Sequence, residues 1–265
     1  MTDLVHHAAE RIAKHLRILN GRYPAALPGL ESFSRRRGQD GLPDWPEWCW
    51  VPMAAAASIV SNASMRNPAD IGRVAAVAQW ALHTPTIVLP RQEVAERAVP
   101  GKAEDIESMD IAIPRDHLLE VLGSSCHYLI QPLDRPHDHA GDWLHGVYVH
   151  LEHDSHSGRT EVRFVLDFGS GWNGLIPSFV HADQPTLAWS ARDIAATAAP
   201  SPVPGEVTAD FARVHTWMAW PLLGALLDDD ARLVGPTPVP GTTLPAEVPA
   251  ERWELTYGAP RMRPV

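Results

Sequence analysis

The chain has 265 residues, of which 45% are hydrophobic and 20% are charged, so it can bury a sizeable core and wholesale disorder is excluded. The net charge of −10 repels phosphate backbones, so we expect no direct binding of nucleic acid. The charge is uneven, because residues 1–40 carry seven basic and only four acidic side chains.

The two cysteines, Cys49 and Cys126, form no Cys-x-x-Cys pair, so the sequence supports neither a thiolate zinc site nor a redox motif. So few cysteines suit a reducing compartment. The N-terminus lacks the apolar core of a signal peptide, and no apolar stretch approaches the ~20 residues that span a bilayer. We therefore expect a cytoplasmic protein without a membrane partner, and nothing in the sequence indicates a cofactor.

Helical periodicity dominates the first half of the chain. The segment Gly21–Gly41 is rich in Pro, Gly and Arg, which predicts a loop, and β-branched residues predict a short strand at Thr86–Leu89. Apolar residues at helical spacing predict the remaining elements. These predicted helices run from the N-terminus to about Leu19, Met53–Ser61, Ala69–Leu82, Arg91–Val99, and Pro114–Leu122 closed by Gly123.

Strand periodicity follows in the second half. Cys126–Gln131 reads as a buried strand, and Trp143–Glu152 and Arg159–Phe168 alternate as the two strands of a hairpin. The remaining predicted elements are a strand at Pro185–Trp189, a helix opened by a Ser190–Asp193 capping box and reaching Thr197, and a helix at Thr208–Leu227 kinked by Pro221.

This order of elements predicts an α+β fold, in which N-terminal helices pack on an antiparallel sheet that contains a long hairpin. We expect residues 1–234 to form a single domain that includes a C-terminal helix. Residues 235–265 are dominated by Pro and Gly and are expected to form an extended tail packed on that domain.

The segment from Trp45 to Pro52 places three indoles, Trp45, Trp48 and Trp50, just before a predicted helix. Indoles combine a large apolar face with one donor and suit stacking on an extended peptide, so these residues are candidate peptide-binding groups. The alternative is that they fill the top of the core. Cys49, which lies among them, is a poor candidate nucleophile because nothing nearby would lower the pKa of its thiol.

A histidine-rich stretch lies between residues 137 and 156. Its His-Asp-His-Ala-Gly-Asp run superficially resembles a hydrolase metal motif, although the aspartate is one position late for that motif and no histidine follows it. Imidazole and carboxylate are suitable ligands for zinc, so a metal-dependent hydrolase is one alternative, and a polar loop is the other. The weak metal candidates are His137, His139 and Asp142.

The hairpin allows a sharper prediction. Val147, Val149 and Leu151 should share a buried face with the apolar residues of the second strand, which requires Leu151 to pair with Val162. This register places two glutamates directly opposite each other, an arrangement that suits acid–base chemistry or, on a solvated face, is screened by water. The residues predicted on this second face, and our candidates for catalysis, are Glu152, Glu161, His150 and Arg163.

Several motifs in their order resemble a group of mobile-element proteins carried by plasmids and prophages, whose characterised family is the type V-A anti-CRISPR family. The resemblance covers roughly Leu42–Asp167. The motifs that carry it are Leu42–Cys49 with Val51–Ala54, the helix Val74–Trp80 with Thr84–Val88, the Cys-x-Tyr strand Cys126–Ile130, and the hairpin segments His145–Glu152 and Gly158–Arg163.

The resemblance implies a protein that suppresses production of a host effector nuclease and does not block the assembled enzyme. Its partner would be a protein or nascent peptide of a CRISPR effector, met at the ribosome, and Tyr128 of the Cys-x-Tyr strand would join the tryptophans in binding it. The alternatives from another class are the metal-dependent hydrolase and a non-catalytic regulatory or antitoxin-like binding module.

Overall fold

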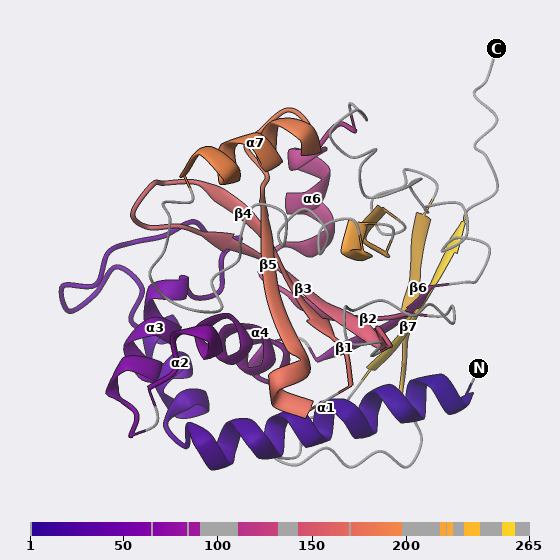
Figure 1. Ribbon diagram of the computed structural model, residues 1–265, viewed down its shortest axis with the longest axis horizontal. Coiled ribbons are helices and arrows are strands. Elements are labelled where there is room, and N and C mark those ends of the chain that lie inside the picture. Colours follow the sequence, from indigo (N-terminus) through magenta and orange to yellow (C-terminus); the bar gives the residue numbers. More distant parts are fainter. Residues whose placement is uncertain are drawn as a thin grey trace.

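The computed structural model is a mixed β-sheet covered by helices on both faces (Figure 1). The structure describes residues 2–64, 66–83, 85–90, 111–131, 143–169, 171–197, 218–220, 222–224, 231–238 and 251–257. The helices are α1 (Thr2–Arg22), α2 (Ala26–Arg35), α3 (Met53–Asn62), α4 (Ile71–Leu82), α6 (Arg115–Leu122) and α7 (Leu187–Thr197), with short 3-10 turns η1 (Pro68–Asp70) and η3 (Gly171–Gly174). None of the helices in these ranges is long and apolar enough to cross a membrane.

The seven strands lie in the order β5-β4-β3-β2-β1-β7-β6. Strand β1 runs parallel to both β2 and β7, and every other pair of neighbours is antiparallel. The strands are β1 (Thr86–Pro90), β2 (Cys126–Ile130), β3 (Gly146–His153), β4 (Thr160–Asp167), β5 (Leu175–His181), β6 (Ala231–Pro238) and β7 (Glu251–Tyr257). The α+β class is confirmed, but the sheet is mixed and not wholly antiparallel.

Each face of the sheet has its own hydrophobic core. Helices α1 to α4 cover one face, where Ile87, Tyr128 and Val165 point toward them. Helices α6 and α7 and the helical residues 218–220 and 222–224 cover the other face, and there Val149 and Phe164 are among the buried strand residues. We call the first side the α1 face and the second the α6 face.

Three predictions about individual elements were wrong, and one strand was not predicted. The segment predicted as a loop after Gly21 contains α2, because Pro28 lies at its third position, where a helix has no use for the missing N–H. Strand β5 was not predicted, since it contains Pro177, which an edge strand tolerates. The predicted strand Pro185–Trp189 instead begins α7, whose first turn is capped by Thr186 Oγ1 accepting from the Trp189 amide at 3.3 Å.

The fourth correction concerns the C-terminal part of the chain, which was expected to be an extended tail. Residues 231–238 and 251–257 form β6 and β7, and β7 pairs with β1 in the middle of the sheet. The predicted helix Arg91–Val99 and most of the predicted helix Thr208–Leu227 lie outside the described residues.

The packing between β2 and β3 leaves no space for a side chain at Gly146. A Cβ atom there would lie 2.6 Å from Tyr128 Cζ and 2.7 Å from the Leu129 carbonyl oxygen. We expect Gly146→Ala to lower the free energy of unfolding by about 1–3 kcal/mol, the usual cost of overpacking, measured by chemical denaturation. The matched control is Gly21→Ala in α1, where nothing lies within 4 Å; it should stabilise the protein by about 0.5–1 kcal/mol, and equal effects of the two changes would contradict the prediction.

Candidate functional site

The three indoles of the aromatic segment do not share one environment. Trp45 is buried, with 6% of its surface exposed, whereas Trp48 and Trp50 are half-buried. Trp48 packs against the core of the α6 face, and Trp50 packs against the core of the α1 face. The segment therefore wraps past the end of the hairpin, and its tryptophans are not assembled into one continuous aromatic surface.

The aromatic segment is fastened to the hairpin. The backbone amide of Met53, at the start of α3, donates to Glu152 Oε1 at 2.5 Å. The ring of Trp48 meets the ring of His153 edge-on, with their centroids 6.0 Å apart. Burial raises the pKa of the Cys49 thiol, which lies between the two tryptophans, to about 12, so Cys49 is not a thiolate nucleophile at neutral pH.

Trp50 lines an open pocket of about 390 Å³, which we call the Trp50 pocket. Its indole stacks on the imidazole of His83 with ring centroids 6.2 Å apart, and the Nε2 atom of His83 lies 2.7 Å from the Ser124 hydroxyl. Arg37, on the rim, makes ion pairs with Asp44 at 3.4 Å and with Glu47 at 3.7 Å. This pocket combines one aromatic face with hydrogen-bonding groups of both kinds.

Tyr128 does not belong to any such surface. Its side chain is fully buried on the α1 face, and its hydroxyl donates to Asp167 Oδ2 at 2.9 Å. The implied peptide-binding role of Tyr128 is therefore corrected to a role in the core. The tyrosine of the Cys-x-Tyr strand points inward because Cys126, Tyr128 and Ile130 all face the helices.

The predicted register of the hairpin is confirmed. Leu151 pairs with Val162, Glu152 pairs with Glu161, and His150 pairs with Arg163. The apolar set faces α6, so the charged set lies together on the other side, facing the N-terminal helices.

This charged side is not solvated, contrary to the alternative of a water-screened face. Only 2% of Glu152 and 4% of Glu161 is exposed, and His150 is equally enclosed. Arg163 compensates both carboxylates: its Nε lies 3.4 Å from Glu152 Oε2, and its Nη2 pairs with Glu161 Oε2. His181 Nε2 lies 3.6 Å from the second oxygen of Glu161. We call these five groups the glutamate cluster.

One guanidinium cannot neutralise two buried carboxylates, and the pKa of Glu152 reflects this. Burial is the main cause that raises the pKa of Glu152 to about 7; the charge of Arg163 opposes the rise and repulsion from Glu161 adds to it. Burial, assisted by the charge of Arg163, lowers the pKa of His150 to about 3, so this imidazole is neutral. The geometry gives the cluster a structural role, since neither glutamate meets solvent where a substrate could reach it.

Metal-site candidates His137, His139 and Asp142 lie outside the described residues. Within the part of the chain that the structure describes, no three His, Cys, Asp or Glu side chains are grouped so that they could hold a metal ion. His150 and His153, from the same stretch, are instead engaged in the hairpin.

A second buried charge cluster on the α1 face was not predicted from the sequence. Arg11 of α1 donates from Nε to Asp167 Oδ2 at 2.8 Å and from Nη2 to Oδ1, and Asp167 is fully buried. His15, one helical turn later, lies 3.0 Å from the hydroxyl of Tyr148 through its Nδ1. A signal for this cluster did exist, because Arg11 and His15 interrupt the apolar stripe of α1 at a spacing of four residues.

Burial alone would raise the pKa of Asp167, but the hydrogen bond from Arg11 and the neighbouring charges outweigh burial, and the pKa lies below its ordinary value. Burial lowers the pKa of His15 to about 4, so the imidazole beside this ion pair is neutral. The cluster therefore holds one fixed ion pair that ties α1 to the end of β4.

The chain matches no protein-family model, and no curated protein is similar to it in sequence. Among solved structures, the crystal structure of AcrVA2 is similar to this fold, with a TM-score of 0.59. The similarity covers 94% of this chain and 84% of that chain, at 13% sequence identity. At this identity the likeness establishes a shared fold.

We expect Glu152→Gln to remove a pH dependence of stability. Because the pKa of Glu152 is raised from 4.5 to about 7 in the folded protein, the folded state keeps a proton that the unfolded chain releases, and the free energy of unfolding falls as the pH rises between these values. The wild type should lose up to about 3 kcal/mol relative to the variant between pH 4.5 and pH 7.

Denaturant unfolding of the wild type and of Glu152→Gln across this pH range measures the effect. The difference between their free energies of unfolding is taken at each pH, so that the contribution of the buried histidines, which both proteins share, cancels. Glu120→Gln, at an exposed position on α6, serves as the control and should follow the wild type. Parallel curves for the wild type and Glu152→Gln would contradict the raised pKa.

Asp167→Asn should be strongly destabilising, because it leaves the guanidinium of Arg11 without its carboxylate in a largely buried site. The expected loss in the free energy of unfolding is about 3–5 kcal/mol, measured by chemical denaturation at neutral pH. The matched control, Glu31→Gln, breaks the exposed pair between Glu31 and Arg35 and should cost no more than about 0.5 kcal/mol. A loss below about 1 kcal/mol for Asp167→Asn would show that the ion pair does not hold α1 on the sheet.

Proposed function

We propose that this protein is an anti-CRISPR protein of a mobile genetic element that binds the polypeptide of a host CRISPR effector nuclease and suppresses its production. The observation that carries the proposal is the likeness in fold to AcrVA2, a type V-A anti-CRISPR protein, over 94% of this chain. The motifs that resemble the type V-A family support it, because they follow one another in the same order. Fold alone does not determine function, so the proposal needs a site that can be tested.

The Trp50 pocket is the proposed contact with the effector polypeptide. Trp50 offers a half-buried aromatic face, and the side chains of Ser34, Gln39 and Ser124 supply polar groups around it. An extended peptide needs such a combination: a surface for one side chain and partners for its unpaired backbone groups. The bond from the Met53 amide to Glu152 holds the segment that carries Trp50, which lowers the entropic cost of binding.

The size of this pocket favours a segment over a folded surface. A volume of about 390 Å³ accommodates a few side chains of an extended chain, whereas a folded protein domain needs a much broader contact area. An effector exposes extended segments while it is being synthesised and buries most of them once folded. The pocket therefore supports recognition of a nascent peptide and an effect on production.

The first test is co-expression with a type V-A effector nuclease in bacteria, with effector protein and effector mRNA measured separately. We expect both to fall by about tenfold or more, which requires that the protein binds at least about nine in ten of the nascent effector peptides. Two altered effector genes separate the targets: a synonymously recoded gene changes the RNA and keeps the peptide, and a compensated frameshift keeps most of the RNA and changes the peptide. Suppression should persist for the recoded gene and be lost for the frameshifted gene; the reverse result would contradict recognition of the polypeptide.

The second test is Trp50→Ala, which removes the aromatic face of the pocket. We expect it to abolish suppression of the effector and to lower the thermal unfolding midpoint, because Trp50 packs against the core of the α1 face; the midpoint must stay above the assay temperature, so that the loss reflects the pocket and not unfolding. Trp189→Ala is the matched control, because Trp189 is 55% exposed on α7 and lies outside the pocket. Full suppression by a folded Trp50→Ala protein would exclude the Trp50 pocket as the peptide site.

A further inference from the structure

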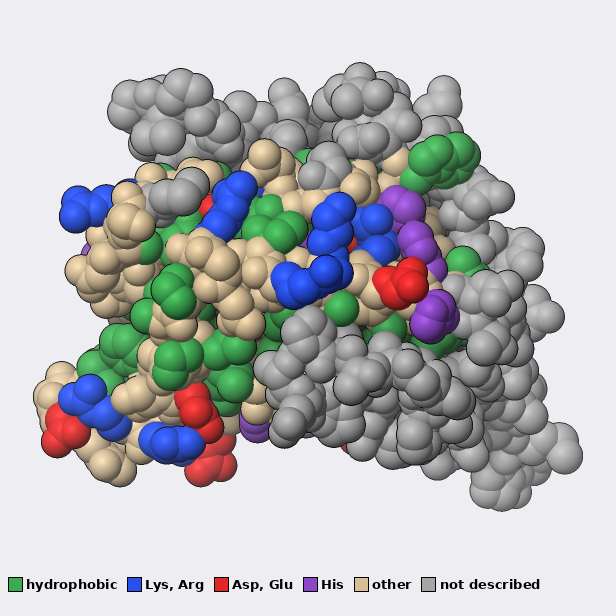
Figure 2. All heavy atoms as spheres, turned by 90° about the horizontal axis from the view of Figure 1, so that it is seen from below, with side chains coloured by type: hydrophobic (Ala, Val, Ile, Leu, Met, Phe, Trp, Pro, Cys, Tyr) green, Lys and Arg blue, Asp and Glu red, His purple; other side chains and the backbone are tan. Residues whose placement is uncertain are grey.

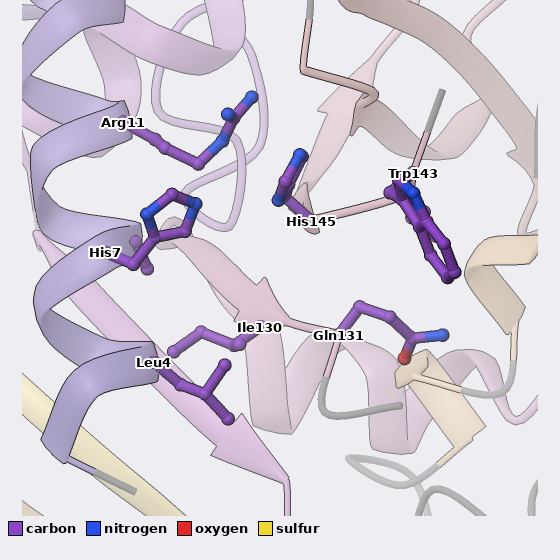
Figure 3. A pocket seen from close by; sticks show the side chains of 9 residues that line it. Leu4, His7, Arg11, Ile130, Gln131, Trp143 and His145 are labelled. Carbon is purple, nitrogen blue, oxygen red and sulfur yellow. The ribbon is translucent and has the colours of Figure 1, made fainter. Parts of the chain in front are cut away.

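A second pocket, which we call the α1 pocket, lies between the first half of α1 and the ends of β2 and β3 (Figure 3). Its volume is about 310 Å³. Leu4, Ile130 and Leu144 give it apolar walls, and Trp143 stands on its rim with 48% of its surface exposed. Leu4 is itself 40% exposed, so two of the large apolar side chains that the described surface leaves open adjoin the same cavity.

The polar wall of this pocket consists of two imidazoles, one guanidinium and the side-chain amide of Gln131. The imidazoles of His7 and His145 face each other with ring centroids 5.5 Å apart, and Arg11 lies beside them (Figure 3). Asp167 fixes the guanidinium of Arg11 from behind, so its position does not depend on a ligand. No aspartate or glutamate is among the described residues that line the pocket.

Among the described residues this lining contains no acidic group, although the chain has 32 acidic side chains and a net charge of −10. The surface around the pocket is mainly basic. Lys14 and Arg17 are exposed on α1, as is Glu10, which pairs with His6 at 3.3 Å. Figure 2, which views the molecule from the α1 side, shows basic side chains and histidines gathered there, with an acidic side chain beside them. An acidic protein that keeps one apolar cavity in basic surroundings offers a complementary surface to an anion that carries an apolar body.

We propose that the α1 pocket binds an acidic peptide segment in which a glutamate or aspartate neighbours a large apolar residue. The apolar side chain enters between Leu4, Leu144 and the indole of Trp143. The carboxylate lies against the imidazoles and the guanidinium, which donate charge-assisted hydrogen bonds. This site is separate from the Trp50 pocket, so the proposal stands whether or not the protein is an anti-CRISPR protein.

The test uses three synthetic hexapeptides with blocked ends. Each alternates phenylalanine and leucine with one polar residue, which is glutamate in the first peptide, glutamine in the second and lysine in the third. Binding to the full-length protein is measured by isothermal titration calorimetry at low ionic strength. We expect the glutamate peptide to bind at least about tenfold more tightly than the glutamine peptide, with the lysine peptide weaker still, and the preference to shrink as salt is added. No binding of the glutamate peptide at millimolar concentration, or equal binding of all three, would overturn the proposal.

Matched variants locate the site. His7→Ala and Trp143→Ala should each weaken the glutamate peptide by about fivefold or more, and neither should unfold the protein, because both side chains are exposed. His6→Ala, at the neighbouring exposed position of α1, and Trp189→Ala, on α7, should leave the affinity within about twofold. Equal effects of a variant and its control would show that the peptide binds elsewhere.

Two other occupants would each overturn the proposal. If the chain dimerises in a Trp143-dependent manner and the dimer excludes the peptide, the pocket is a contact between copies. If a single-stranded oligouridylate binds more tightly than the glutamate peptide, and if His7→Ala weakens its binding, the surface recognises nucleic acid. Light scattering and the same calorimetric titration distinguish these outcomes.

Discussion

The guanidinium of Arg163 lies between two opposed glutamates, and the enclosure of the hairpin on both faces depends on it. Without this compensation, Glu152 and Glu161 would need water, and the N-terminal helices could not cover that side of the sheet. At the other end of the hairpin, Arg11 compensates the buried charge of Asp167 in the same way. The central strands are thus buried on two faces, although the alternation of polar and apolar residues would ordinarily indicate one solvated face.

The glutamate cluster also positions the aromatic segment. Glu152 accepts the amide of Met53, one of the donors that the start of α3 leaves without a helical partner. The segment that carries Trp48 and Trp50 is therefore tied to the hairpin by a hydrogen bond that the buried carboxyl group of Glu152 accepts. The position of Trp50 at its pocket thus depends on a charge cluster inside the molecule, while the neighbouring Trp48 packs against the core of the opposite face of the sheet.

The sequence predicted the hairpin well because its information is local. Two apolar strands of similar length have one register that buries both, and the opposed glutamates follow from that register. What covers the charged side was not predictable, since α1, α3 and α4 come from distant parts of the chain. Propensity rules also failed where Pro has an unusual position: Pro28 inside the first turn of α2 and Pro177 in an edge strand both argued against the elements that contain them.

In the candidate site, too, local features were predictable and burial by distant segments was not. Sequence reasoning named Trp45, Trp48 and Trp50 together as candidates, but could not tell the half-buried Trp50 from Trp45, which is buried, because burial depends on helices elsewhere in the chain. It placed Tyr128 with the tryptophans by resemblance, whereas the alternation along β2 turns that side chain into the core. No sequence motif indicated the α1 pocket, since its described walls come from three separate segments of the chain.

The two pockets lie at opposite ends of β2, because Ser124 precedes the strand and lines the Trp50 pocket, while Gln131 follows the strand and lines the α1 pocket. Six residues, five of them in β2, lie between Ser124 and Gln131, a distance of about 20 Å along the chain. The described residues of the two linings differ in charge: those of the Trp50 pocket include Glu47 with two arginines, and those of the α1 pocket include no acidic residue. The intervening strand is buried, so a ligand of one pocket cannot extend directly into the other. A single polypeptide that filled both would have to pass around the molecule with two chemically distinct segments, and its affinity would then depend on the length of chain between them.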